Sequence, residues 1–219
     1  MSVADSALPL SDPYRLGHRP PNLARGHGGG GPATKRVIVG YGFWLFLLSD
    51  IVIFSCLFAA YAVLADATAG GPRARDIFEL DRVALETACL LASSFFCGLA
   101  TIAVARRNQL LTQAALAITG LLGLAFLLFE ASEFAALYAH GNGPTRSAFL
   151  TGFFTLVGCH GLHVTAGLLW LGTMMAQLLA KGFRPDIGRR FLCFSMFWHF
   201  LDIIWVAIFS LVYLVGTRL

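Results

Sequence analysis

The stretch FLCFSMFWHFLDIIWVAIFSLVYLVG, residues 191–216, decides the class of fold, because it is long and apolar enough to cross a bilayer. A membrane-spanning helix needs about 20 predominantly apolar residues. The stretch nevertheless carries His199 and Asp202 near its middle. Three roles suit such a pair: hydrogen bonds that hold helices together, binding of a metal or haem, and movement of protons.

The composition of the whole chain indicates a lipid environment. Of the 219 residues, 57% are hydrophobic and only 13% are charged, and the mean hydropathy is +0.72. Five stretches are long enough to cross as helices and too long for the roughly ten-residue strands of a membrane barrel. We therefore predict an all-α membrane protein. Its membrane domain covers residues 38–219, with five transmembrane helices at about 38–64, 83–105, 110–138, 148–180 and 191–216.

Residues 1–37 differ from the rest of the chain. The segment contains LARGHGGGGPATKR, which is rich in glycine and charge and buries too little apolar surface to fold alone. We predict a disordered cytoplasmic tail. A cleaved signal peptide is not expected, because the first apolar run begins late, is too long and contains Asp50.

The Lys and Arg residues predict the orientation, since cytoplasmic loops collect positive charge. With the tail inside, eleven of the sixteen basic residues face the cytoplasm. We expect a cytoplasmic N-terminus and a periplasmic C-terminus. The sequence pI of about 9.0 then reflects topology and anionic lipid headgroups, and no nucleic-acid partner is expected. The eleven are Arg15, Arg19, Arg25, Lys35, Arg36, Arg106, Arg107, Lys181, Arg184, Arg189 and Arg190.

The candidate functional residues are the ionisable side chains inside the spans, because such groups are costly in lipid and should face the bundle interior or another protein. They are Asp50, Glu86, Glu130, Glu133, His160, His163, His199 and Asp202. Three pairs have the spacing i, i+3, which places both members on one helical face. We expect no Lys or Arg among them. A rise of about 1.5 Å per residue puts Asp50, His160 and His199 at similar depth, which predicts one polar layer near the midplane.

Three interpretations of this layer stay open from the residues alone. Interhelical hydrogen bonds are a common use of such groups, at about 0.6–2 kcal/mol each. His160, His163 and His199 could instead be ligands of a metal or haem, although His160 and His163 share a face of one helix and cannot flank a macrocycle. A proton path or ion carrier uses the same residue types, but no span is broken at mid-depth by proline or paired glycines.

Two further patterns concern packing. Ser94 and Gly98 are small and four residues apart, which permits a close approach of helices. The chain also has four tryptophans, for which packing or lipid contact is expected rather than a quinone-stacking site. They are Trp44, Trp170, Trp198 and Trp205.

Four segments, in chain order, resemble the signature stretches of haem-copper oxidase subunit III. They are FLLSDIVIFSCLFAAYAVL (46–64), FEASEF (129–134), GCHGLHVTAG (158–167) and WHFLDIIW (198–205). The segment ATAGGPRARDIFELDRVALETACLLASS (67–94) resembles the quinol-oxidase branch of that family, in particular the bacterial cytochrome bo type. The resemblance extends from about residue 38 to the end of the chain.

The resemblance implies a non-redox subunit III of a proton-pumping terminal ubiquinol oxidase of aerobic respiration, in the bacterial cytoplasmic (inner) membrane. Such a subunit supports assembly, stability and proton uptake of the catalytic subunit, and itself has no catalytic, cofactor-binding or metal-binding residue. Haems and copper are expected in the catalytic subunit I. Subunit I, other oxidase subunits and membrane phospholipid are the expected partners.

Two alternatives to this function remain: subunit III of a cytochrome c oxidase, or an independent membrane transporter or metalloprotein.

The resemblance favours a structural role for His199 and Asp202, which would tie the fifth helix to its neighbours. The partners available to them are Asp50, Glu130, Glu133, His160 and His163.

Overall fold

Five helices in this computed structural model, which describes residues 35–217, are long and apolar enough to cross a membrane. They are α1 (Lys35–Leu64), α3 (Leu80–Ala105), α4 (Gln109–Ala139), α5 (Ala148–Lys181) and α6 (Pro185–Ile208), which continues as the π-helical segment η2 (Phe209–Leu214). The short helix α2 (Ala74–Ile77) lies between α1 and α3. The predicted all-α membrane fold with five spans is confirmed. The predicted tail lies outside the described residues except for its last three, which form the start of α1.

The helix ends follow local sequence signals. The side chain of Asn108 accepts a hydrogen bond from the backbone N–H of Leu111 at the start of α4, and Ser147 caps α5 in the same way through Leu150. Helix α5 stops at Gly182, whose positive φ of 63° suits a residue without a Cβ. A proline opens α6, where a missing N–H costs no helical hydrogen bond.

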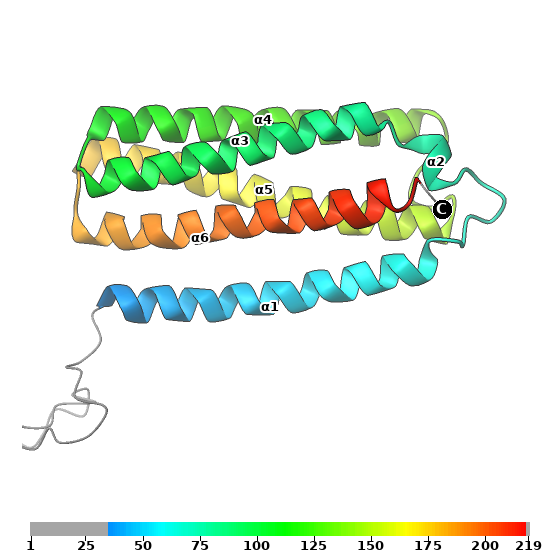
Figure 1. Cartoon of the computed structure of the whole chain (residues 1–219), viewed down its shortest axis with the longest axis horizontal. Coiled ribbons are helices and arrows are strands. Elements are labelled where there is room, and N and C mark those ends of the chain that lie inside the picture. Colours follow the sequence, from blue (N-terminus) through cyan, green and yellow to red (C-terminus); the bar gives the residue numbers. More distant parts are fainter. Residues whose placement is uncertain (1–34, 218–219) are drawn as a thin grey trace, which may run out of the picture.

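Helix α6 is the centre of the bundle. Of its most apolar window, 61% is buried, against 22% to 33% for the other four spans. It packs against α1, α3 and α5, and Figure 1 shows α1 along one edge of the bundle beside α6. The stretch that carries His199 and Asp202 is therefore a core helix of the fold.

Glycines on two neighbouring helices let one large ring into this core. The indole ring of Trp198 lies between Gly123 of α4 and Gly167 of α5, and a Cβ at either glycine would come within 2.9 Å of it. Trp198 and Trp205 are both buried, whereas the side chain of Trp44 is half exposed. The tryptophans of α6 therefore serve packing, as predicted.

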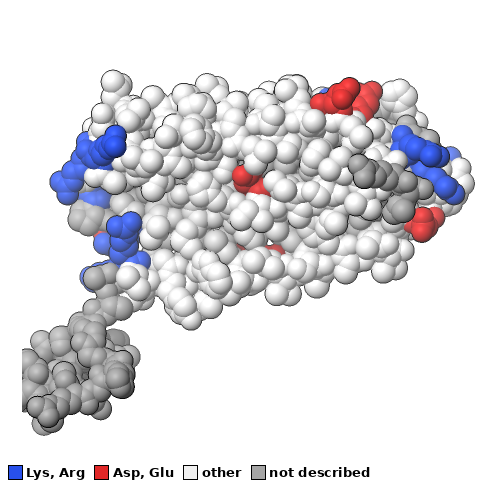
Figure 2. Space-filling model, viewed as in Figure 1, with Lys and Arg blue, Asp and Glu red and all other residues white. Residues whose placement is uncertain are grey.

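Charged residues gather at the two ends of the bundle and leave an uncharged belt between them, apart from a few acidic atoms (Figure 2). We name the two ends the α1-start end and the α2 end. The α1-start end carries Lys35, Arg36, Arg106, Arg107, Lys181, Arg184, Arg189 and Arg190; the α2 end carries Arg73, Arg75, Arg82 and Arg146.

Candidate functional site

Four side-chain contacts connect α6 to α3 across the core. They join Trp205 Nε1 to Thr87 Oγ1 (3.0 Å), Trp198 Nε1 to Ser93 Oγ (3.1 Å), His199 Nδ1 to Ser94 Oγ (2.7 Å) and Ser195 Oγ to Thr101 Oγ1 (3.3 Å). Both indole N–H groups donate to hydroxyl oxygens, so neither tryptophan leaves a buried donor unpaired. The contacts extend from the Ser195–Thr101 pair at one end to the Trp205–Thr87 pair at the other, as two antiparallel helices require, and they hold α6 against α3.

His199 has a different partner from those that its sequence context suggested. Its imidazole pairs with Ser94, and the Asp202 carboxyl lies near the same hydroxyl. Among residues 35–217, no hydrogen bond or ion pair joins either side chain to an acid or histidine of another span. The described structure therefore joins neither residue to any of the available partners that the sequence contains. The reason is rotational: this side of α6 faces α3, which carries a serine at that level.

His160 occupies an apolar cage at the centre of the bundle. It has no exposed surface, and its ring is stacked on Trp205 with centroids 5.2 Å apart. The ring of Phe126 meets it edge-on at 5.8 Å and that of Phe54 at 6.4 Å. Neither ring nitrogen has a hydrogen-bond partner in the described part of the chain. The cage therefore holds the ring by packing alone.

His163 and Asp50 lie at the contact between α5 and α1. The Nδ1 of His163 donates to the carbonyl oxygen of Cys159, 2.7 Å away on the same helix. Its ring is 5.2 Å from that of Phe54 on α1. Asp50 is buried near Cys159, and its Oδ2 has no partner within residues 35–217. The two histidines of α5 thus have separate surroundings.

Three carboxyl groups, those of Glu86, Glu130 and Glu133, form a buried cluster between α3 and α4 toward the α2 end. The hydroxyl of Tyr213 donates to Glu133 Oε2 over 3.3 Å. Both oxygens of Glu86 and one of Glu130 lack a hydrogen-bond partner in the described structure. Glu130 also presses on α5, because a Cβ at Gly161 would lie 2.6 Å from its Oε1. Glu133 and Tyr213 therefore join α4 to η2.

A cation accompanies this cluster, contrary to expectation. Arg82 Nε lies 3.9 Å from Glu86 Oε1, one turn away on the same helix. The guanidinium also donates to the carbonyl of Phe129 and to the hydroxyl of Ser132 on α4. Helix α3 begins at Leu80, earlier than predicted, so that Arg82 belongs to the span. One arginine thus lies within ion-pair distance of the carboxyl cluster.

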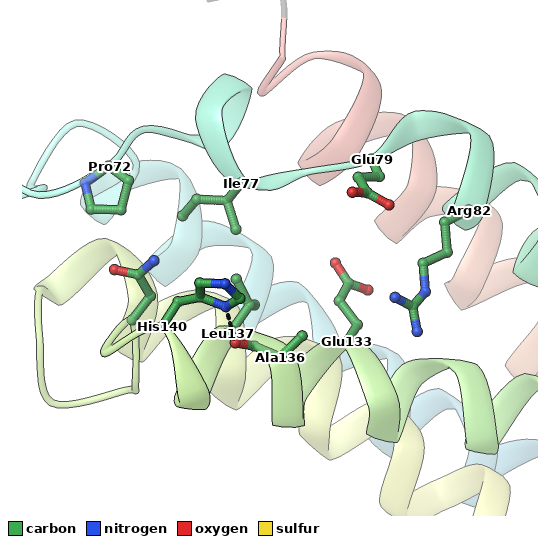
Figure 3. A pocket seen from close by; sticks show the side chains of 9 residues that line it. Pro72, Ile77, Glu79, Arg82, Glu133, Ala136, Leu137 and His140 are labelled. Atoms are coloured by element: carbon green, nitrogen blue, oxygen red, sulfur yellow. Dashed lines mark hydrogen bonds between the residues drawn. The ribbon is translucent and has the colours of Figure 1, made fainter.

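A cavity of about 330 Å³ opens at the α2 end beside the cluster (Figure 3). The side chain of Glu133 lines it from α4, facing Glu79 and Arg82. The apolar side chains of Ile77 and Leu137 complete much of the wall. Glu133 is therefore the member of the cluster that reaches this cavity.

The polar candidates thus occupy four separate places, so the predicted layer is not one connected set of polar side chains. Depth along a helix follows from the sequence, but the direction in which each side chain points depends on how the helices rotate against one another. Within residues 35–217, no group of three or more His, Cys, Asp or Glu side chains is arranged to hold a metal ion. The contacts that the structure does show are hydrogen bonds and ring packing between helices.

Several residues that complete these contacts were not predicted from the sequence. Ser93 and Thr87 accept the two indole N–H groups, and Tyr213 reaches Glu133. A signal was present: Trp198 and Trp205 are seven residues apart on one face of α6, and buried indoles usually require an acceptor. Short hydroxyl residues at a similar repeat on a neighbouring span were the candidates for that acceptor.

The fold and these contacts define a multi-pass membrane protein whose ionisable side chains are distributed among helix contacts. Comparison with known proteins identifies its family. The family model of cytochrome c oxidase subunit III matches residues 27–217, and the chain belongs to this family.

The relatives at high identity are oxidase subunits. The chain is 47% identical over 217 residues to the cytochrome bo(3) ubiquinol oxidase subunit 3 of Pseudomonas aeruginosa, an alignment that covers 99% of this chain and 100% of the relative. It is 50% identical over 176 residues to the protein of that name from Pseudomonas putida, with 80% and 85% covered. The cytochrome c oxidase subunit 3 of Bacillus sp. PS3 is 42% identical over 175 residues, with 80% and 84% covered. With five spans and bacterial relatives of this kind, the chain is a multi-pass inner-membrane protein.

Proposed function

We propose that this chain is the non-redox subunit III of a proton-pumping terminal ubiquinol oxidase in the aerobic respiratory chain. It supports assembly, stability and proton uptake of the catalytic subunit I. One observation carries the proposal: 99% of this chain aligns with the full length of a bo(3) ubiquinol oxidase subunit 3 at 47% identity. The haems and copper belong to subunit I, and membrane phospholipid surrounds the complex.

In this proposal the intramembrane polar residues of this chain have structural or proton-linked roles. The four hydrogen-bonded contacts between α3 and α6 support a structural role for His199 and Asp202. The separation of the histidines supports the absence of a haem site, since a ligand pair must converge on one iron. Asp50 at the α1–α5 contact is the carboxyl group that this proposal links to proton uptake, because the cavity beside Glu133 lies at the opposite end of the bundle from the proposed cytoplasmic side.

The orientation follows the same proposal. The N-terminus lies in the cytoplasm, and the C-terminus lies in the periplasm. The excess of Lys and Arg at the α1-start end supports this assignment under the positive-inside rule. The cavity at the α2 end then opens to the periplasmic side.

A second candidate is subunit III of a cytochrome c oxidase, and the 42% identity to the PS3 protein favours it. The electron donor binds elsewhere in such a complex, so the fold of this chain is compatible with either enzyme. Steady-state oxygen uptake with ubiquinol and with reduced cytochrome c separates the two.

The proposal is tested by purifying the tagged chain from its native membranes in mild detergent. We expect companion subunits that carry all the haem and oxygen uptake that depends on ubiquinol. Loss of the chain should lower the yield or durability of this activity. Recovery of a functional five-helix protein without haem-bearing companions would contradict the assignment.

A further inference from the structure

One surface of the bundle brings ionisable atoms to the outside in the middle of the spans. It lies where α3 and α6 run side by side, and we name it the α3–α6 face. Figure 2 shows acidic atoms at mid-length of an otherwise uncharged surface, in the view in which Figure 1 places α3 and α6 beside each other. The face consists of the exposed apolar residues Leu91, Phe95, Ile102, Ile203 and Val206 and the partly exposed residues Ser94, Gly98, His199 and Asp202.

The polar part of this face is incompletely paired. Ser94 engages His199 Nδ1, and the other ring nitrogen makes no hydrogen bond with a described residue. Asp202 is partly exposed, and its Oδ1, an atom that the bundle covers, also lacks a partner within residues 35–217. An unpaired polar group that faces hydrocarbon is unfavourable, because lipid tails cannot form a hydrogen bond with it. Contact with lipid tails alone would therefore leave the polar groups of this surface without hydrogen bonds.

Exposed hydroxyl groups elsewhere on the bundle are paired by hydrogen bonds within their own helices. Ser49, Thr155 and Thr173 each donate to a carbonyl oxygen three or four residues earlier in their own helix. Such groups can face lipid without an unpaired donor. The α3–α6 face is distinguished by its ionisable pair and not by exposed polarity in general.

The shape of the face is equally distinctive. A Cβ added at Gly98 would meet nothing within 4 Å, so that neither α4 nor α6 fills the space above it. Glycines that serve contacts within the bundle differ, because a Cβ at Gly161 or Gly167 would lie 2.6 or 2.9 Å from a side chain. Small residues four apart, here Ser94 and Gly98, allow a further helix to approach closely.

We propose that the α3–α6 face is the docking surface for a transmembrane helix of a companion subunit, which presents a hydrogen-bond donor at the depth of Asp202. This inference rests on the proposed function, which supplies the multisubunit complex. A second copy of this chain fits less well, because a symmetric contact would bring one Asp202 toward the other. A lipid tail offers no donor. The complementary partner is therefore a helix with a polar side chain at mid-bilayer depth.

Two glycines provide a matched test. Gly98→Leu fills the space on the docking face, and Gly172→Leu adds the same side chain on α5, where a Cβ likewise meets nothing within 4 Å. Each variant is purified with its complex from native membranes by a tag on this chain. We expect Gly98→Leu to lower the recovery of companion subunits about tenfold relative to Gly172→Leu, which should behave as the wild type. Equal recovery from both variants overturns the proposed docking face.

Photo-crosslinking tests the docking face without Gly98→Leu and therefore applies even if that variant fails to fold. Phe95 is replaced by p-benzoylphenylalanine in the otherwise native complex, and irradiation should yield an adduct with a companion subunit. An adduct only with lipid, or only with a second copy of this chain, overturns the inference. If the wild-type chain brings down no companion at all, the proposed function itself fails. If companions are present but the Phe95 probe does not reach them, the docking face alone is wrong.

Discussion

The indole ring of Trp198 on α6 lies so close to Gly167 on α5 that a Cβ at this glycine would stand 2.9 Å from Cζ3. The two helices meet here without a side chain between the ring and the backbone. The ring also donates its N–H to Ser93 on α3, so one residue fixes α6 against two neighbours. This contact explains why a large tryptophan is accommodated at the centre of a five-helix bundle.

The first prediction concerns this contact. Gly167→Ala should lower the free energy of unfolding by about 1–3 kcal/mol, because the added methyl group overpacks the core against a rigid ring. The measurement is the unfolding transition of the purified protein in detergent, followed by tryptophan fluorescence. Gly172→Ala is the control, since its methyl group meets open space. Equal transitions for the two variants would show that Trp198 can move aside.

The hydrogen bond between Trp205 and Thr87 provides a second prediction. A double-mutant cycle with Trp205→Phe and Thr87→Val should give a coupling energy of about 0.6–2 kcal/mol, because each single variant removes the same interhelical bond. Unfolding from mixed micelles measures the four free energies. Combining Trp205→Phe with Thr165→Val should give additive effects, since Thr165 bonds only to a carbonyl of its own helix. Additivity in the first cycle would contradict the bond.

The charge balance around Glu86 leads to a third prediction. Arg82→Gln should destabilise the bundle by about 1–3 kcal/mol, because it leaves a fully buried carboxyl group without its cation. The double variant Arg82→Gln/Glu86→Gln should recover much of that loss. Unfolding midpoints of the two single variants and the double variant test this ordering. A double variant less stable than Arg82→Gln would show that the carboxyl group does not depend on Arg82.

The fourth prediction addresses His199 and Asp202. His199→Ala or Asp202→Ala should lower the amount of assembled complex or its activity over time, while the haem spectrum of the remaining complex stays unchanged. Ser94→Ala removes only the partner hydroxyl and should have the same effect to a smaller degree. Subunit gels and optical spectra of purified complexes provide the measurement. Loss of a haem band from the isolated chain on His199→Ala would instead indicate a ligand role.

The sequence by itself determined the number of spans and their approximate positions, because the thickness of the bilayer core imposes a minimum apolar length on every crossing helix. It also indicated the acidic and histidine side chains that lie within the spans, since a helix advances by a constant rise per residue, but it missed Arg82 because α3 begins earlier than predicted. The family resemblance rests on residues of the chain itself, and the match over residues 27–217 confirms it.

Only the tertiary structure decided which side chains meet. The pairing of His199 with Ser94, the aromatic cage of His160 and the position of Arg82 beside Glu86 all depend on the rotation of each helix about its axis. In a bundle whose helices are apolar on most sides, the hydrophobic pattern barely constrains that rotation. Close packing constrains it instead, through contacts such as that of Trp198 with Gly123 and Gly167, which form only when all the helices are in place.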